Sequence, residues 1–262
     1  MSLRDRFDLV VLDWAGTMVD FGCEAPVKAL IKAFAEESVA IDATSARRDM
    51  GKSKADHVRG LLQIPVVAAA WHAARGRAAN DSDVESLMSR LGPLMREYAT
   101  EAATLIPGAR ETVERLRALG FKIASSTGYT REMMAPVLAR AAAQGYTPDH
   151  VICSGETPAG RPTPLMIYKA CAELGVWPLS RVVKVDDAEA GIEEGKFAGA
   201  FTVGVASGNT VGLSLNEWNA LSADKRAAHL ETADRILRAA GADLIIESVA
   251  DLIPALERRD LV

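Results

Sequence analysis

The chain alternates short runs of β-branched and apolar residues with longer stretches in which apolar residues recur every three or four positions. The short runs predict six strands: Phe7–Leu12, Lys122–Ser126, His150–Cys153, Val182–Asp186, Phe201–Val205 and Leu244–Ile246. The longer stretches predict helices near residues 110–119, 131–144, 164–174, 188–198, 226–240 and 249–258. Strands separated by such helices form right-handed crossovers in a parallel sheet. The pattern predicts an α/β fold with a Rossmann-like, doubly wound parallel sheet.

The segment between the first two predicted strands is too long for a simple crossover. It shows helical patterns near residues 26–37, 54–62, 66–75 and 83–103 and no convincing strand. We therefore predict a small all-helical cap domain over residues 21–104, inserted into an α/β core made of residues 1–20 and 105–262. Hinges are expected near residues 22–23 and 104–108.

Composition limits the classes of function. The 262 residues are 49% hydrophobic and 25% charged, as in globular proteins that dissolve in water. A formal net charge of -5 gives no electrostatic reason to expect nucleic-acid binding. No apolar run is long enough for a membrane span or a signal segment, so we expect a cytoplasmic protein. The three cysteines, Cys23, Cys153 and Cys171, suggest buried reduced thiols rather than disulfides or a zinc site.

The first predicted strand ends on a carboxylate. Asp13 follows three apolar residues and leads into a turn with the sequence Ala15-Gly16-Thr17. An aspartate before a turn often only stabilises that turn, so Asp13 alone does not establish a catalytic site. The carboxyl end of a parallel strand is, however, where a doubly wound sheet binds its ligands.

Two further motifs suit an anionic ligand. Thr127 and Gly128 lie at the end of the second predicted strand, where a hydroxyl and backbone N–H groups can hold phosphate oxygens. The alternative role is an N-cap for the helix predicted over residues 131–144, for which Thr127 and Thr130 are both candidates, and the two roles are compatible. Arg161 lies between a glycine and a proline, in a rigid loop from which it can offset charge on a phosphoryl group. A lone arginine is otherwise most often a solvated charge.

Asp186 and Asp187 end the fourth predicted strand, and with Asp13 they would form an oxygen site suited to Mg²⁺. These motifs resemble the haloacid dehalogenase superfamily, whose first motif usually reads Asp-x-Asp-Gly-Thr. Ala15 replaces the second acid, which argues against hydrolysis of an ordinary phosphate ester. Where the superfamily has Gly-Asp-x-x-x-Asp, this chain has Asp186, Asp187 and, in place of the last acid, Gly191. The resemblance implies a nucleophilic Asp13 and a metal bound by Asp13, Asp187 and the Ala15 carbonyl, and leaves the role of Asp186 open.

The predicted cap contains a lysine that suits carbonyl chemistry. If residues 54–59 form a helix, Lys54 and His57 share one face. An amine beside an imidazole suits a Schiff base, because the amine must be neutral to attack and each step moves a proton. Lys52 and Arg59 would lower the pKa of Lys54 if they point the same way. Lysines on such helices are mostly solvated, so the spacing alone does not decide the role.

Together with the first motif, this segment resembles the phosphonoacetaldehyde hydrolase family, also called phosphonatases. The resemblance spans nearly the whole chain and rests on five stretches: Asp13-Trp14-Ala15-Gly16-Thr17, Asp20-Phe21-Gly22-Cys23, Met50-Gly51 with Lys54 and Asp56-His57-Val58-Arg59, Thr127-Gly128-Tyr129-Thr130-Arg131-Glu132-Met133-Met134, and Pro158-Ala159-Gly160-Arg161-Pro162. It implies a Mg²⁺-dependent homodimer, with one ion per subunit, that cleaves phosphonoacetaldehyde to acetaldehyde and phosphate during degradation of 2-aminoethylphosphonate. An aminoethylphosphonate transaminase is the implied metabolic partner.

The family's chemistry implies a role for each site residue. Asp13 would attack phosphorus and carry the phosphoryl group, while a protonated imine on Lys54 would accept the electrons of the carbon–phosphorus bond. His57 would shuttle protons near the imine. Met50 and Tyr129 resemble residues of the family's active site, although methionine and aromatic positions are more often packing.

Some alternatives remain open. Lys52-Ser53 replaces an apolar pair common in the family, so there are two candidate lysines, and the spacing to the flanking motifs favours Lys54. The chain could instead be a phosphatase or phosphonate hydrolase of the same superfamily in which Lys54 only binds an anion. A catalytically silent binding or regulatory protein on this fold is a further alternative, against which the intact Asp13, Thr127, Arg161 and Asp187 argue.

Overall fold

A six-stranded parallel sheet forms the centre of the molecule in a computed structural model that describes residues 2–258. In chain order the strands are β1 (Leu9–Leu12), β2 (Lys122–Thr130), β3 (His150–Ser154), β4 (Val182–Asp186), β5 (Phe201–Val205) and β6 (Leu244–Ile246). Their order across the sheet is β3-β2-β1-β4-β5-β6, so the chain builds outward first on one side of β1 and then on the other. The six predicted strands and the doubly wound α/β fold are confirmed.

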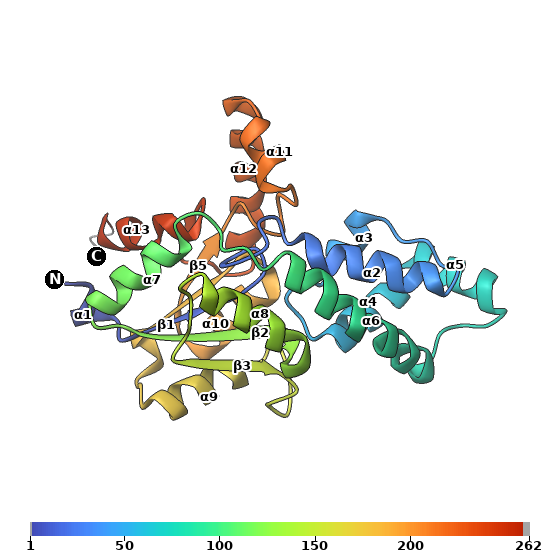
Figure 1. Cartoon of the computed structure of the whole chain (residues 1–262), viewed down its shortest axis with the longest axis horizontal. Coiled ribbons are helices and arrows are strands. Elements are labelled where there is room, and N and C mark those ends of the chain that lie inside the picture. The colour runs from blue at the N-terminus through green and yellow to red at the C-terminus, as the bar shows by residue number, and fades with distance from the viewer. Residues whose placement is uncertain (1, 259–262) are drawn as a thin grey trace.

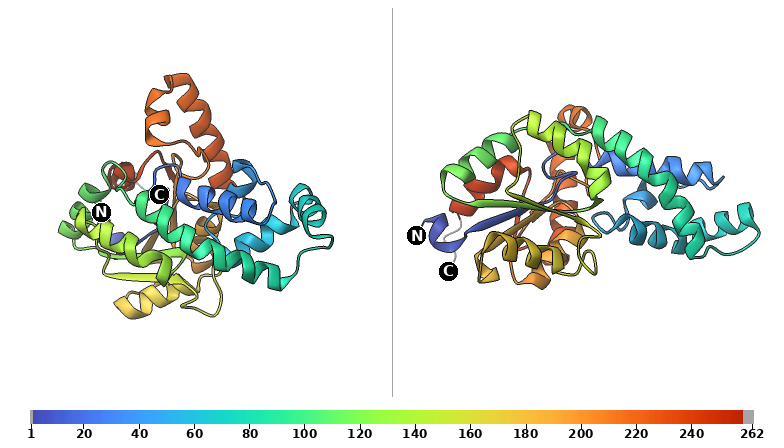
Figure 2. Two further views of the ribbon diagram at one scale, coloured as in Figure 1. Left: turned by 45° about the vertical axis from the view of Figure 1, so that its right-hand side comes forward. Right: turned by 60° about the horizontal axis from the view of Figure 1, so that its bottom comes forward.

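Helices cover both faces of this sheet, as Figure 2 shows. One face carries α7 (Ala109–Ala118), α8 (Arg131–Ala143) and α13 (Leu252–Arg258), and the other carries α9 (Leu165–Leu174), α10 (Glu189–Ala198) and α12 (Ala223–Ala239). Alternate side chains of β1 enter the two layers: Val10 and Leu12 join one apolar cluster, Leu9 and Val11 the other. Burial on both faces explains why this strand is apolar at every position.

Five helices between β1 and β2 gather beyond the carboxyl ends of the strands, at the right of Figure 1. They are α2 (Glu24–Glu36), α3 (Ala43–Arg47), α4 (Lys54–Gln63), α5 (Pro65–Arg75) and α6 (Asp81–Glu101). The long helices α2 and α6 pack together, and Leu30, Phe34, Leu87 and Leu91 are fully buried at spacings of four residues. Of these helices only α3 lacks a counterpart among the sequence predictions, because it has five residues and only one of them is buried.

The two connections from this helical segment to the sheet run side by side. Val19 forms an antiparallel bridge with Leu105, and the Ile106 amide donates to the Met18 carbonyl at 2.9 Å. At the start of the segment, Gly22 has a φ of +80° and Cys23 a φ of +55°. The chain therefore turns sharply just before α2, at the expected first hinge.

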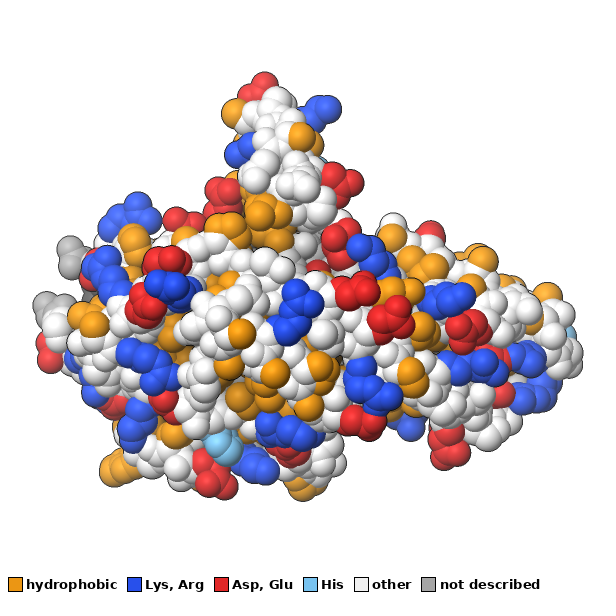
Figure 3. All heavy atoms as spheres, viewed as in Figure 1, with side chains coloured by type: hydrophobic (Ala, Val, Ile, Leu, Met, Phe, Trp, Pro, Cys, Tyr) orange, Lys and Arg blue, Asp and Glu red, His pale blue; other side chains and the backbone are white. Residues whose placement is uncertain are grey.

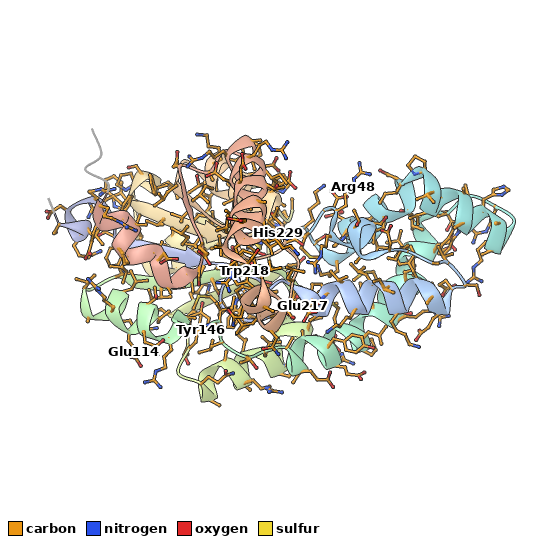
Figure 4. All side chains as sticks on the ribbon, turned by 90° about the horizontal axis from the view of Figure 1, so that it is seen from above. Arg48, Glu114, Tyr146, Glu217, Trp218 and His229 are labelled. Carbon is orange, nitrogen blue, oxygen red and sulfur yellow. The ribbon has the colours of Figure 1, made fainter. Side chains whose placement is uncertain are left out.

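Two elements differ from the sequence predictions. β2 runs on to Thr130 rather than ending at Ser126, with an irregular register between Thr127 and Thr130. The hydroxyl-rich sequence there suggests a turn, but pairing with β3 keeps the chain extended. The second element is α11 (Leu215–Ala220), which with α12 projects from the sheet at the top of Figure 1. Its Trp218 is buried and lies edge-on to His229, as Figure 4 shows.

The short elements α1 (Leu3–Arg6), η1 (Leu179–Arg181) and η2 (Val249–Asp251) complete the described chain. No helix within residues 2–258 combines the length and the apolar character that crossing a bilayer requires. On the face shown in Figure 3, acidic and basic side chains are interspersed over both the sheet domain and the helical segment.

Candidate active site

Three aspartates meet where β1 and β4 end. Asp13 follows β1, and Asp186 and Asp187 close β4, which pairs directly with β1. Each carboxylate offers an oxygen within 4.8 Å of the others, and all three side chains are buried. Gly16 allows the turn after Asp13 to lie against this cluster, since a Cβ there would come within 1.9 Å of Asp187 Oδ2.

Arg161 lies behind Asp13, where every nitrogen of its guanidinium has a protein acceptor. Nη1 donates to Asp13 Oδ1 at 2.8 Å, Nε to Glu194 Oε2 at 2.9 Å, and Nη2 to the Ser126 carbonyl at 2.6 Å. The side chain has no exposed surface. Arg161 thus fixes one oxygen of Asp13 and leaves Oδ2 free of this contact.

The buried charges at the strand ends do not balance. Beside Arg161, the second cation is Lys184, whose Nζ lies 2.9 Å from Asp186 Oδ2 and 3.2 Å from Glu194 Oε2. Burial, and then the nearby Asp186, raise the pKa of Asp13 to about 6. The pKa of Asp187 is raised well above its usual value by burial and by the charges of Asp13 and Asp186. A divalent cation bound by these oxygens would relieve the repulsion, so the cluster suits a hard metal ion.

Asp186 and Gly191 are structurally coupled. A Cβ on Gly191 would lie 1.9 Å from Asp186 Oδ2 and 2.0 Å from its Cγ. The Asp186 carboxylate therefore fills the space that a side chain at position 191 would need. Its Oδ1 accepts the Ala188 amide at 3.1 Å, which braces the turn after β4. An aspartate at position 186 therefore requires glycine at position 191, which explains why the extra acid and the missing acid occur together.

The end of β2 touches the helical segment. Thr127 Oγ1 accepts the Tyr129 amide at 3.2 Å, as in a hydroxyl-stabilised turn. A Cβ on Gly128 would lie 2.3 Å from the Lys52 carbonyl oxygen and 2.8 Å from that of Gly51. Only glycine at 128 lets the two backbones approach this closely.

Lys54 begins α4 and is only 2% exposed. Ser53 caps the helix by accepting the Asp56 amide at 3.1 Å, which directs the next side chain inward. Burial lowers the pKa of Lys54 to about 8. Its Nζ lies 5.2 Å from the centre of the Tyr129 ring, so a side chain of the helical segment meets an aromatic side chain of the sheet domain.

The expected influence of Lys52 and Arg59 on Lys54 is corrected by the structure. Lys52 Nζ pairs with Asp49 at 2.5 Å, and Arg59 pairs with Asp56 at 3.0 Å. Neither is among the causes of the lowered pKa of Lys54, to which burial contributes most. Lys52 precedes the N-cap Ser53 and lies outside α4, and its ammonium group is paired with Asp49.

His57 lies one turn after Lys54 and is also buried. Its Nε2 lies 3.0 Å from the Ala46 carbonyl oxygen, which can only accept, so this nitrogen carries the proton. Burial, and then the charge of Lys54, lower the pKa of His57 to about 3. The ring is therefore neutral at pH 7.

A small cavity of about 20 Å³ lies between the two regions, and this is room for about one water molecule. Its lining contains eight residues predicted from the sequence: Asp13, Ala15, Met50, Lys54, Thr127, Gly128, Tyr129 and Asp187. Among the described residues, His57 and Arg161 stand behind this lining. The Tyr129 hydroxyl is buried and lacks a hydrogen-bond partner within residues 2–258, so it is available to a ligand.

The lining also includes Cys23 and Gly51, which belong to stretches that resemble the family but were given no role, and Ala188, which the sequence did not single out. Cys23 was interpreted only as a buried thiol. Burial and the nearby Asp187 raise its pKa well above the usual value, so the thiol is protonated. Its place directly after the first motif, next to the predicted hinge and within a stretch that resembles the family, was the signal in the sequence that pointed to the site.

A parallel α/β sheet with an aspartate after β1, a Gly-Thr turn and acids after β4 defines a haloacid dehalogenase-like hydrolase, and the family model of that description matches residues 7–199. Phosphonoacetaldehyde hydrolase of Paraburkholderia phytofirmans is 43% identical to this chain, over 94% of the chain and 93% of that protein. The enzyme of the same name from Bacillus cereus is 36% identical over 98% and 99%. The crystal structure of a phosphonoacetaldehyde hydrolase-like protein from Oleispira antarctica matches with a TM-score of 0.94 and 40% identity, over 96% and 91%. This chain is a hydrolase and belongs to the phosphonoacetaldehyde hydrolase family.

Proposed function

We propose that this enzyme cleaves the carbon–phosphorus bond of phosphonoacetaldehyde, giving acetaldehyde and phosphate, in the degradation of 2-aminoethylphosphonate. The observation that carries the proposal is the shared cavity of Lys54 and Asp13. An amine suits an aldehyde and a carboxylate nucleophile suits phosphorus, so a substrate with both groups matches both ends of the cavity. The names of the relatives support the same substrate.

In the first step Lys54 would add to the aldehyde. With a pKa of about 8, roughly a tenth of the amine is neutral at pH 7 and able to attack. Loss of water from the adduct then gives a protonated imine, so the nitrogen regains a positive charge. His57 is the proposed proton shuttle: its neutral ring leaves Nδ1 without a partner among the described residues, so Nδ1 can accept a hydrogen bond from the amine or from a water molecule, and a pKa of about 3 lets it hold a proton only transiently.

In the second step Asp13 would attack phosphorus. Because Arg161 holds Oδ1, the other oxygen is the one in position to attack. A phosphorus–oxygen bond forms, the carbon–phosphorus bond breaks, and its electron pair moves into the imine to give an enamine. Water then cleaves the aspartyl phosphate, while protonation of the enamine carbon and hydrolysis of the imine release acetaldehyde and restore Lys54.

The alanine at position 15 fits this leaving group. A phosphate ester loses an alkoxide, which a nearby carboxylic acid would protonate. Here the electrons leave through the imine on Lys54, and an acid at position 15 has no proton to deliver. The small side chain of Ala15, which lines the cavity, leaves that space to the substrate.

We further propose that one Mg²⁺ per subunit is held by Asp13, Asp187 and the backbone carbonyl of Ala15. The three buried carboxylates and the raised pKa of Asp187 support a cation at this point. Such an ion would offset the repulsion between Asp13 and the anionic phosphonate.

Residues 21–104 would act as a movable cap. The cavity has room for about one water molecule, whereas a phosphonate group alone carries three oxygens. The substrate must therefore arrive while the helical segment is displaced, by rotation near residues 22–23 and 104–108. The expected homodimer and cytoplasmic location belong to the same proposal.

Trapping with borohydride tests the imine directly. Treatment of the enzyme with borohydride and phosphonoacetaldehyde should attach a two-carbon unit to Lys54, located by mass spectrometry of the peptides. In parallel, acetaldehyde release should require Mg²⁺ and should greatly exceed release of phosphate from an ordinary phosphate ester. Acetaldehyde release without an adduct on Lys54 would refute the Schiff base. Phosphate-ester hydrolysis without cleavage of the phosphonate would refute the proposed function.

A further inference from the structure

Arg47, the last residue of α3, joins the helical segment to the sheet domain. Its guanidinium reaches across the junction between them. Nη1 donates to the Gly22 carbonyl at 2.8 Å, beside the first hinge, and Nη2 donates to the Gly212 carbonyl at 3.0 Å. Nη1 also lies 3.5 Å from the carbonyl and 3.4 Å from the side-chain oxygen of Asn209. One side chain thus contacts the helical segment, the hinge and the loop after β5.

The junction is built tightly around this side chain. Gly212 has a φ of +65°, and a Cβ there would lie 2.6 Å from Arg47 Nε. At the hinge, a Cβ on Gly22 would lie 2.0 Å from the Leu213 carbonyl oxygen. Both positions require glycine, for the backbone conformation and for the close approach.

The loop that Arg47 holds also holds Asp187. The backbone N–H of Asn209 donates to Asp187 Oδ2 at 2.6 Å. This hydrogen bond lowers the pKa of the Asp187 carboxyl group, although burial raises it by more. Next to it, a Cβ on Gly208 would lie 2.3 Å from Asp187 Cβ. The backbone of residues 208–209 therefore packs directly on Asp187, and Arg47 contacts the same loop from its other side.

All the acceptors of Arg47 are uncharged oxygens. Within residues 2–258, no carboxylate lies at ion-pair distance from it, in contrast to most arginines of this chain. A guanidinium that bonds only carbonyl and amide oxygens depends on geometry, because no opposite charge holds it at other positions. Its contacts are therefore specific to one arrangement of the two parts.

We propose that Arg47 is a positioning residue that couples the docked state of the helical segment to the orientation of Asp187. The inference rests on the proposed function, in which this segment moves and Asp187 binds the cation. When the segment rotates at the hinge, Arg47 leaves Gly212 and Asn209, and the amide that orients Asp187 loses its support. By reciprocity, a cation bound at Asp187 stabilises the docked segment.

Metal binding without substrate tests this coupling. Arg47→Met keeps the aliphatic stem and removes every donor. Mg²⁺ affinity, measured by calorimetry, should fall about tenfold, the equivalent of one or two hydrogen bonds of a charged group. Amide exchange, followed by mass spectrometry, should quicken over residues 207–213. In the wild-type protein Mg²⁺ should slow exchange near residues 22–24, and in Arg47→Met it should not.

Arg48→Met is the matched control. Arg48 is exposed and Figure 4 shows it on the outside of the helical segment, so this variant removes the same charge one position away. It should bind Mg²⁺ and exchange like the wild type. An equal loss of Mg²⁺ affinity in Arg47→Met and Arg48→Met would attribute the effect to net charge and overturn the proposal. Unchanged Mg²⁺ affinity and amide exchange in Arg47→Met would overturn it as well.

Gly212→Ala provides an independent route, since the added Cβ displaces the guanidinium while Arg47 remains. It should reproduce the loss of Mg²⁺ affinity, and the double variant should be no weaker than either single one, because both remove the same contact. Additive losses would overturn the proposal. These measurements need no substrate, so failure of the borohydride experiment would refute the proposed chemistry and leave the coupling separately testable.

Discussion

The strand ends of the sheet and the start of α4 both bury ionisable groups, but they compensate for burial in different ways. At the strand ends charge meets charge: Asp13 contacts Arg161, and Asp186 contacts Arg161 and Lys184. At α4 the amine of Lys54 has no carboxylate at ion-pair distance within residues 2–258, and it lies 5.2 Å from the centre of the Tyr129 ring. At the strand ends, ion pairs stabilise the charged side chains, whereas at α4 the lack of such a pair favours the neutral form of Lys54.

This difference matches the chemistry proposed for each side. A carboxylate must be ionised to attack phosphorus, whereas an amine must be neutral to attack an aldehyde. Burial raises the pKa of Asp13 to about 6 and lowers that of Lys54 to about 8. The nearby cations Arg161 and Lys184 limit the rise at Asp13, so it remains mostly ionised at pH 7. Desolvation acts on both groups, but nearby cations keep Asp13 ionised, whereas Lys54 has no carboxylate partner and can become neutral. Each group thus reaches the protonation state in which it is a nucleophile.

The largest expected effect is the loss of kcat when either nucleophile is replaced, and borohydride trapping distinguishes the two replacements. Asp13→Asn and Lys54→Arg should each lower kcat on the order of 10⁴-fold, because each removes a covalent step. Only Asp13→Asn should still give the borohydride adduct, since imine formation precedes attack on phosphorus. Lys52→Arg is the control, because Lys52 pairs with Asp49 and points elsewhere. Its activity should stay within about twofold of the wild type, within the range of an exposed substitution. An adduct in Lys54→Arg would assign the imine to another lysine.

The next effect concerns the paired charges of the sheet domain. Gly191→Asp forces a fifth carboxylate into the space of Asp186, and Asp186→Gly leaves Arg161 and Lys184 short of a partner. Each should lower the free energy of unfolding by about 3 kcal/mol. The double exchange restores both the space and the charge and should recover about 2 kcal/mol of the summed loss. Denaturant unfolding of the four proteins measures this coupling, and additive losses would show that the two positions are independent.

The smallest effect is the pH dependence of the unpaired amine. Only neutral Lys54 attacks, and its neutral fraction rises about tenfold per pH unit below a pKa of about 8. The ratio kcat/KM should therefore increase from pH 6.5 to 8 and level off above that. Steady-state rates in buffers of constant ionic strength measure this. A flat profile between pH 6.5 and 8 would contradict a rate-determining neutral lysine.

The sequence predicted the sheet well because each strand is an apolar run between clear helical patterns. It also predicted most of the cavity lining, since Asp13, Thr127 and Asp187 lie at or near the carboxyl ends of strands that must meet at one edge of a parallel sheet. The sharp turn at residues 22–23 lies where the length of the intervening segment led us to expect a hinge, and the hinge motion itself stays a prediction. In each case the decisive information lies close together along the chain.

The missed features depend on contacts between distant segments. The link between Gly191 and Asp186 is a steric overlap that no spacing rule contains. The role of Arg47 needs the loop at 208–212, which lies more than 160 residues away in the chain. Lys52 and Arg59 were expected to lower the pKa of Lys54 only if they pointed the same way, and their pairing with Asp49 and Asp56 directs them elsewhere. Side-chain direction and pairing decide such effects, and a linear pattern does not contain them.

The contact between Lys54 and the Tyr129 ring links the proposed movement of the helical segment to the protonation state of the Lys54 nitrogen. An aromatic face attracts a cation far more than a neutral amine, so the attraction between the helical segment and the sheet domain varies with the charge on one nitrogen. In the proposed reaction that charge returns with the protonated imine and disappears in the enamine. The helical segment would therefore be held most strongly against the sheet domain in the imine complex, just before the carbon–phosphorus bond breaks. In the enamine this attraction would weaken. Product release would thus become possible only after the electrons of that bond have moved into the imine.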